Sequence, residues 1–195
     1  PSPPQDLVFE LVESFGGVHQ HNAVVYNRQE NSFAFNGYSS FVRLVRPIQD
    51  DFSISFEFKT ADTRGAPRVW YGGRGLVDAE VAGVTNDFGV TIGGGHVMFG
   101  VRKPTIVSGF VADKNWHTAL ATRQQSTGAF RLVIDGILTN SGTGSECTRT
   151  ASQCISTTAS LNVPPFIGIG RLQTGINTFP EMSASSMSIA IGRGK

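Results

Sequence analysis

The stretch Phe52-Ser53-Ile54-Ser55-Phe56-Glu57-Phe58-Lys59 decides the fold class of this chain. Its apolar side chains occupy every second position, and the residues between them are polar. Because successive side chains of a β-strand point to opposite faces, this alternation predicts a strand with one face in a core and the other in water. A helix would need an apolar repeat near 3.6 residues, which the stretch does not have.

Short apolar runs separated by turn residues lie on both sides of this strand. Asp135-Gly136 and Gly93-Gly94-Gly95 each separate two apolar runs, and Asn36-Gly37 marks a hairpin or a tight corner. Such residues adopt the positive φ angles that tight reversals require. Many short, evenly spaced strands without a convincing helix predict an all-β fold, a two-sheet antiparallel sandwich.

Length and composition agree with one all-β domain. The chain has 195 residues, of which 23 are Gly and 14 are Phe, a composition typical of short strands joined by turns. Closely spaced prolines favour extended backbone, so residues 1–6 are expected to form a linker or an extended arm. Residues 7–195 are expected to form a single domain.

Charge and hydropathy exclude two classes of partner. The net charge is +1 and no basic cluster occurs, which argues against nucleic acid. No apolar stretch reaches the roughly 20 residues of a membrane-spanning helix. The sequence begins Pro1-Ser2-Pro3-Pro4 without an initiator Met, which we interpret as a mature chain whose signal peptide was removed, although a fragment boundary would look the same. We therefore expect a secreted or cell-surface protein.

The two cysteines, Cys147 and Cys154, lie in a stretch rich in Ser, Thr and Gly that reads as a long surface loop over residues 140–158. We predict that they form a disulfide in an oxidising compartment. The alternative is two unrelated buried thiols, which a polar loop disfavours. Residues 139–160 are also a candidate for O-linked sugar.

A longer pattern resembles the laminin-G family. It consists of Ala112-Asp113-Lys114-Asn115-Trp116-His117-Thr118, a strand, a Thr-Gly turn and then Leu132-Val133-Ile134-Asp135-Gly136. The upstream residues 75–90 are similar to bacterial-type members of the laminin-G and pentraxin-like jelly rolls. The resemblance spans roughly residues 7–192 and implies a laminin-G/concanavalin-like jelly roll, in which Trp116 is expected to fill the space between the sheets.

The resemblance also implies a calcium site on one rim of the sandwich. Asp87 precedes the apolar run 88–92 and Asn162 precedes the run 166–170, and both match family ligand positions by spacing. Calcium takes about six to eight oxygen ligands, so backbone carbonyls would have to complete the shell. The alternative is that Asp87 caps a turn and Asn162 is an ordinary loop residue.

A cluster of aromatic and basic residues is the candidate for sugar binding. Trp70 and Tyr71 are flanked by Arg68 and Arg74. Aromatic faces stack on sugar rings, and arginine supplies forked donors. The alternative is that Trp70 and Tyr71 alternate as one core residue and one surface residue of a strand.

Two acidic residues, Asp78 and Glu80, would share a face of a strand and could bind ligand or metal, or act as acid and base. The concanavalin-like glucanases carry the triad Glu-x-Asp-x-x-Glu, but Leu76 stands where the first Glu is required. Glycosidases also place two carboxylates on opposite sides of the scissile bond, and here the only candidates are Asp78 and Glu80, without a nearby Trp platform. We therefore expect that the chain is not an enzyme.

These features predict a non-catalytic extracellular recognition or adhesion module that binds glycan or protein, with calcium as an assisting ion. The alternative is a structural subunit of an extracellular fibre or pilus-like polymer. In that case the chain would self-associate through residues 1–12, whose segment Leu7–Val12 would pair with a sheet edge of a neighbour.

Overall fold

A computed structural model provides the structure of the chain. It describes residues 20–22, 24–27, 29, 32–36, 39–45, 48–65, 67–80, 86–139, 142–143, 153–161, 166–170 and 184–192. Within these ranges the chain forms strands and two short 3-10 turns, and no α-helix. The elements are β1 (Gln20–Asn22), β2 (Val25–Asn27), β3 (Ser32–Ala34), β4 (Phe41–Val45), β5 (Phe52–Thr60), η1 (Trp70–Gly72), β6 (Arg74–Asp78), β7 (Phe88–Gly93), β8 (His96–Val101), β9 (Thr105–Phe110), β10 (Trp116–Gln124), η2 (Gln125–Thr127), β11 (Ala129–Ile134), β12 (Ile137–Leu138), β13 (Gly142–Thr143), β14 (Cys154–Ile155), β15 (Phe166–Ile169) and β16 (Ala184–Gly192).

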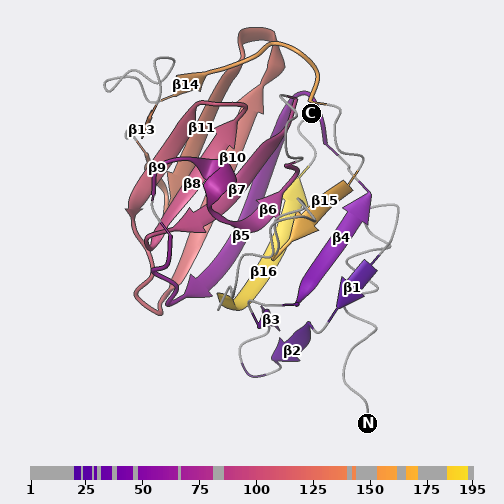
Figure 1. Cartoon of the computed structure of the whole chain (residues 1–195), viewed down its shortest axis with the longest axis vertical. Coiled ribbons are helices and arrows are strands. Elements are labelled where there is room, and N and C mark those ends of the chain that lie inside the picture. The colour runs from indigo at the N-terminus through magenta and orange to yellow at the C-terminus, as the bar shows by residue number, and fades with distance from the viewer. Residues whose placement is uncertain are drawn as a thin grey trace.

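The described strands form two sheets (Figure 1). Sheet A has the order β1-β4-β15-β6-β7-β8-β9-β13. Sheet B has the order β12-β11-β10-β5-β16-β3-β2, and β14 also pairs with β11. All paired neighbours are antiparallel. The predicted all-β, two-sheet antiparallel sandwich is therefore confirmed.

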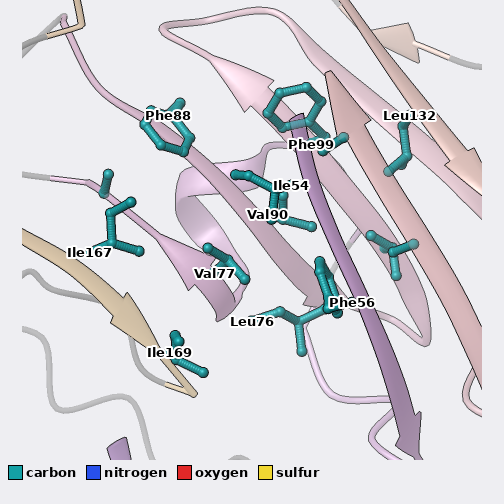
Figure 2. Packing of buried hydrophobic residues seen from close by; sticks show 14 of the residues in the cluster. Ile54, Phe56, Leu76, Val77, Phe88, Val90, Phe99, Leu132, Ile167 and Ile169 are labelled. Atoms are coloured by element: carbon teal, nitrogen blue, oxygen red, sulfur yellow. The ribbon is translucent and has the colours of Figure 1, made fainter. Parts of the chain in front are cut away.

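The alternation that predicted a strand appears directly in β5. The four apolar residues of the run Phe52–Phe58 are buried, whereas Ser55 and Glu57 are exposed. Figure 2 shows side chains from β5 and β11 of sheet B and from β6, β7, β8 and β15 of sheet A gathered between the ribbons. Each fully buried side chain of this size contributes about 1.5–3 kcal/mol, so this shared layer holds the two sheets together.

Two turn predictions are confirmed. Asp135 and Gly136 have φ angles of 52° and 77° and join β11 to β12. Gly94 and Gly95 have φ angles of 60° and 82° and join β7 to β8. In both hairpins the two central residues are left-handed, a geometry that matches the right-handed twist of the flanking strands.

Asn36 marks a corner and not a hairpin, because β3 belongs to sheet B and β4 belongs to sheet A. Its Oδ1 accepts hydrogen bonds from the backbone N–H groups of Ser39 and Ser40, at 2.9 and 3.0 Å. A side-chain amide that bonds its own backbone in this way stabilises a turn. The chain therefore changes sheets here.

The expectation that Trp116 fills the space between the sheets is wrong. Trp116 lies on the outer face of sheet B, 38% exposed, with the Lys59 ammonium 5.3 Å from its ring centroid. The inward positions of β10 carry Ala119 and Ala121 instead. These small residues pair with Phe56 and Ile54 of β5, whose bulk already fills the layer.

Several sequence predictions fall partly or wholly outside the described residues. The segment predicted as a long loop contains the short strands β13 and β14, and Cys154 in β14 is buried in the core and is not a free thiol. Cys147 and residues 1–12 lie outside the described ranges, so the disulfide, the arm over residues 1–6 and self-association stay predictions. No helix in the described ranges is long and apolar enough to cross a membrane.

Candidate functional site

The residues of the predicted sugar-binding cluster have different environments in the structure, and Trp70 is buried. Trp70 is only 1% exposed, because its ring covers the outer face of sheet A at Gly89 and Gly100. Its Nε1 donates to the carbonyl of Arg102 at 2.6 Å. A ring fixed in this way has no free face for a sugar. Of the two interpretations of Trp70 and Tyr71, the structure has one core and one surface residue, although in a 3-10 turn and not in a strand.

The other members of that cluster have different environments. Tyr71 is 45% exposed and Arg68 is exposed in the loop before η1. Arg74 forms an ion pair with the buried Asp62, at 3.5 Å, and Arg64 binds the same carboxylate at 3.0 Å. Arg74 is therefore part of a structural network, and only Tyr71 and Arg68 present an accessible surface.

The acidic residues Asp78, Glu80 and Asp87 form a buried group where β6 ends and β7 begins. The backbone N–H of Glu80 donates to Asp78 Oδ2 at 3.2 Å. Burial, together with the charges of Asp78 and Asp87, raises the pKa of Glu80 from 4.5 to about 8. Asp78 and Glu80, which the sequence suggested as a pair that could bind ligand or metal, are therefore both buried, and a role in binding stays a prediction.

The acidic group has some of the features of a cation site. Its charge favours a cation, and within the described part of the chain Glu80 Oε2 is buried without a hydrogen-bond partner. However, no three His, Cys, Asp or Glu side chains in the described ranges come together in a group that could hold a metal ion. Asp87 belongs to this buried group and Asn162 lies outside those ranges, so the calcium site stays a prediction.

We expect Glu80→Gln to raise the melting temperature above pH 8. The folded-state pKa of Glu80 is about 8 and the ordinary value is 4.5, so the folded chain holds this proton more tightly. The contribution of Glu80 to stability is therefore greatest below pH 4.5 and is lost as the pH rises to 8. Glutamine stays neutral, and the expected gain is at least about 2–4 °C, the shift that one kcal/mol produces at this chain length.

The measurement is thermal unfolding of both chains from pH 4 to pH 9 in EDTA, which removes divalent cations. The difference between the two melting curves isolates Glu80 from all other titrating groups. Equal melting temperatures at every pH would contradict the assignment of a proton to Glu80. Glu57→Gln, on the exposed face of β5, is the control and should change little.

A second site lies beside β9 of sheet A, in a hollow that we call the edge groove. It is an open cavity of about 560 Å³. One wall is the end of β9 and the residue after it, residues 107–111, and the other is His117, Ile134, Asp135 and residues 137–139 of the β11–β12 hairpin. In the described ranges β13 pairs only with Thr105 and Ile106 of β9, and β12 has two residues, so the two sheet edges stay apart.

Two large apolar side chains are exposed in the edge groove. Phe110 is 56% exposed and Ile137 is 73% exposed. The ring of Phe110 packs edge-on against His96, with centroids 5.9 Å apart, and lies where a Cβ of Gly95 would be. Phe110 is therefore exposed and fixed at the same time, which lowers the entropy lost when a ligand covers it.

A histidine between two carboxylates forms the polar end of the edge groove. His117 bonds Asp135 Oδ2 through Nδ1 at 2.7 Å and Asp113 Oδ1 through Nε2 at 3.0 Å. Burial lowers the pKa of His117, but these two hydrogen bonds outweigh it and the pKa is raised. Carboxylates only accept, so both ring nitrogens donate when the imidazole is protonated. The trio then carries one net negative charge.

Sequence reasoning missed this site, because it interpreted Asp135 only as a turn residue and gave His117 no role in binding. One signal was present. The turn that ends at Gly128 sets the register of β10 against β11, which pairs Ala119 with Ile134. The same register places Asp135 opposite Thr118, whose N–H donates to Asp135 Oδ1 at 2.8 Å. The length of this hairpin therefore predicts that Asp135 lies close to His117. The approach of β9 to this hairpin had no comparable signal, because the two belong to different sheets.

Solved structures share the fold of the chain. The mouse laminin alpha1 chain, domains LG4-5, is 21% identical with a TM-score of 0.51, and the match covers 80% of this chain and 39% of that one. For the LG1-3 region of the laminin alpha2 chain the identity is 16%, the TM-score 0.52 and the coverage 80% and 30%. For the binding domain of Paraclostridial Mosquitocidal Protein 1 the values are 12%, 0.50, 88% and 41%.

These likenesses show a laminin-G/concanavalin-like jelly roll, as the sequence resemblance implied. The chain spans less than half the length of each of these solved chains. No protein-family model matches the chain, and no curated protein matches it by sequence.

Proposed function

We propose that this chain is a non-catalytic recognition module, secreted or at the cell surface, that binds a protein or a glycan through the edge groove. The observation that carries the proposal is the pair Phe110 and Ile137, two exposed apolar side chains that line one open cavity of about 560 Å³. Apolar surface gathered in a hollow is a usual mark of a contact site, and this volume is in the range of ligand pockets.

The arrangement of the carboxylates supports binding over hydrolysis. A glycosidase places two carboxyl groups on opposite sides of an accessible bond, about 5–10 Å apart. Asp78 and Glu80 are instead buried beside each other. The laminin domains and the toxin binding domain named above share the fold, and a recognition role is in keeping with those neighbours.

The test is a binding screen of the wild-type chain and the Phe110→Ser/Ile137→Ser variant against arrays of glycans and of extracellular proteins. We expect a ligand of the wild-type chain to bind the variant at least about 10-fold more weakly, since removing a central anchor of a contact site costs 2 kcal/mol or more. The matched control is Ile155→Ser, because Ile155 is also exposed on an edge of sheet B but lies at the other end of β11.

Three results would contradict the proposal. Binding that persists in the Phe110→Ser/Ile137→Ser variant (the groove variant) but is lost in Tyr71→Ser would place the contact surface at η1. Release of reducing sugar from a polysaccharide would make the chain an enzyme. Concentration-dependent polymers that disappear when residues 1–12 are removed would favour the fibre subunit. Each binding series is run with calcium and with EDTA, and calcium assistance predicts a loss in EDTA that Asp87→Asn reproduces.

A further inference from the structure

The shape and chemistry of the edge groove limit what can occupy it. Phe110 on one wall and Ile137 on the other are exposed and Leu138 is half-buried, whereas the lining residues Val107, Val111 and Ile134 are buried. These side chains form a slot for an apolar group. At about 25 cal/mol per Å² of apolar surface removed from water, one covered leucine-sized side chain is enough for weak binding.

A carboxylate lies at one end of the apolar slot. Asp135 lines the groove, and its side chain is 45% exposed. Thr118 and His117 hold the two carboxylate oxygens at 2.8 and 2.7 Å. Asp135 Oδ1 also accepts from the Thr118 hydroxyl at 3.4 Å, so Oδ1 has two donors. Because a carboxylate oxygen accepts two hydrogen bonds, Asp135 is fixed in position and Oδ2 can accept one more.

The charge around Asp135 is negative. Burial raises the pKa of Asp135, but the hydrogen bonds from His117 and Thr118 and the charge of His117 outweigh it, so the pKa is lowered and the group is ionised at neutral pH. Asp113 balances the charge of His117, and none of the described residues that line the groove is lysine or arginine. The described cations nearby are Lys114, in the turn beside Asp113, and Lys59, which lies over Trp116 on the outer face of sheet B. The slot therefore complements a positive group.

The walls do not suit a sugar. Each hydroxyl of a bound sugar needs a hydrogen-bond partner, and an unpaired one costs about 1–3 kcal/mol. The polar side chains of the walls, apart from the charged trio, are Ser108 and Thr139. The hydroxyl of Ser108 already donates to the carbonyl of Gly109 and accepts from Val97 N–H. A protein segment can place a single apolar side chain in the slot while its backbone polar groups stay in water.

Resting on the proposed function, we infer that the edge groove binds a protein segment in which an apolar residue lies next to a lysine or arginine. The apolar side chain occupies the slot between Phe110 and Ile137, and the cation bonds Asp135. The anchor and the charge play different roles here. Apolar burial supplies most of the affinity, and the half-exposed ion pair adds about 2–5-fold and selects the sequence.

The test titrates the full chain, labelled with nitrogen-15, with blocked tripeptides of equal size: acetyl-Leu-Lys-Leu-amide, acetyl-Leu-Gln-Leu-amide and acetyl-Leu-Glu-Leu-amide. We expect the Lys peptide to shift the amides of residues 108–111 and 134–139. The Gln peptide should bind about 2–5-fold more weakly and the Glu peptide more weakly still. Asp135→Asn should remove the preference for Lys, and asparagine tolerates the positive φ of this position.

Phe110→Ser should abolish the shifts for all three peptides, and Ile155→Ser should leave them unchanged. Asp113→Asn tests the charge without altering a groove residue and should reduce the preference for Lys. Equal affinity for the three peptides, or no shift at millimolar concentration, overturns the inference. If the groove variant still weakens an array ligand in that case, the proposed function stands. If a glycan binds the groove amides in place of the peptides, the occupant is a sugar and the inference is wrong.

Discussion

Replacing Arg123 by methionine is expected to lower the free energy of unfolding by about 2–4 kcal/mol. Arg123 is buried at the end of β10, and its guanidinium donates to carbonyls of two separate segments. Nη1 donates to Asp50 at 2.6 Å, and Nη2 donates to Thr157 and Ala159 at 2.9 and 2.8 Å. One side chain thus ties the segment before β5 to the segment after β14.

The size of the effect follows from the acceptors left behind. A buried acceptor that loses its donor costs about 1–3 kcal/mol, and hydrogen bonds from a charged donor are the stronger kind. Water can reach these part-buried carbonyls after the change, so the total is below the sum of the separate bonds. Methionine keeps the apolar stem of the side chain, and the loss therefore reports the guanidinium.

Chemical denaturation of three variants tests this assignment. Arg123→Lys should lie between wild type and Arg123→Met, because an ammonium has donors but not the forked geometry that reaches two segments. Arg131→Met is the matched control on the neighbouring strand β11, where the exposed Arg131 bonds the Gln153 side chain at 2.6 Å. It should change stability by less than about 0.5 kcal/mol. Equal losses for Arg123→Met and Arg131→Met would refute the tie between the segments.

The sequence was sufficient for features that depend on local pattern. The two-residue period of Phe52–Phe58 and the glycine and Asp-Gly turns each depend on a few adjacent residues, and the structure confirms them. Arg123 shows the limit of this reasoning. A charged residue in a strand is ordinarily exposed, and its burial depends on carbonyls that are brought to it by segments 73 and 34 residues away.

The two tryptophans show why the site was harder to predict than the fold. Trp116 and Leu120 share one face of β10 and look like its core face, yet the phenylalanines of β5 leave room only for alanine on the inner side. Trp70 was considered for sugar stacking, and its burial depends on glycines in two other strands. Which face of a strand is covered is a property of its neighbours, and the sequence alone does not contain it.

The second large effect is expected at the contact between Trp70 and β8. Trp70→Ala should lower the free energy of unfolding by about 3–5 kcal/mol, the usual loss for a buried tryptophan. The ring lies on Gly100, and its Nε1 donates to the carbonyl of Arg102. Removing the ring would uncover the outer face of sheet A, whereas the backbone of residue 70 would keep its hydrogen bonds with Thr91 and Thr105.

Gly100→Ala changes the same contact from the side of β8. A Cβ at Gly100 would overlap the indole ring, so the ring must move, at a cost of about 1–3 kcal/mol. Gly109→Ala in β9 is the matched control, since a Cβ there meets no atom within 4 Å and stability should stay within about 0.5 kcal/mol of wild type.

The double variant Trp70→Ala/Gly100→Ala separates a true contact from two independent losses. Once the ring is gone, the new methyl group occupies part of the space it filled, so the double variant should lose less than the sum of the single variants. The expected difference is about 1–3 kcal/mol, measured by chemical denaturation of the four chains of the cycle. Strict additivity would mean that the ring does not rest on Gly100, and the burial of Trp70 would then need another cause. A positive coupling of this size would show that the Trp70 ring packs on sheet A, and this packing is the reason why the ring has no free face for a sugar.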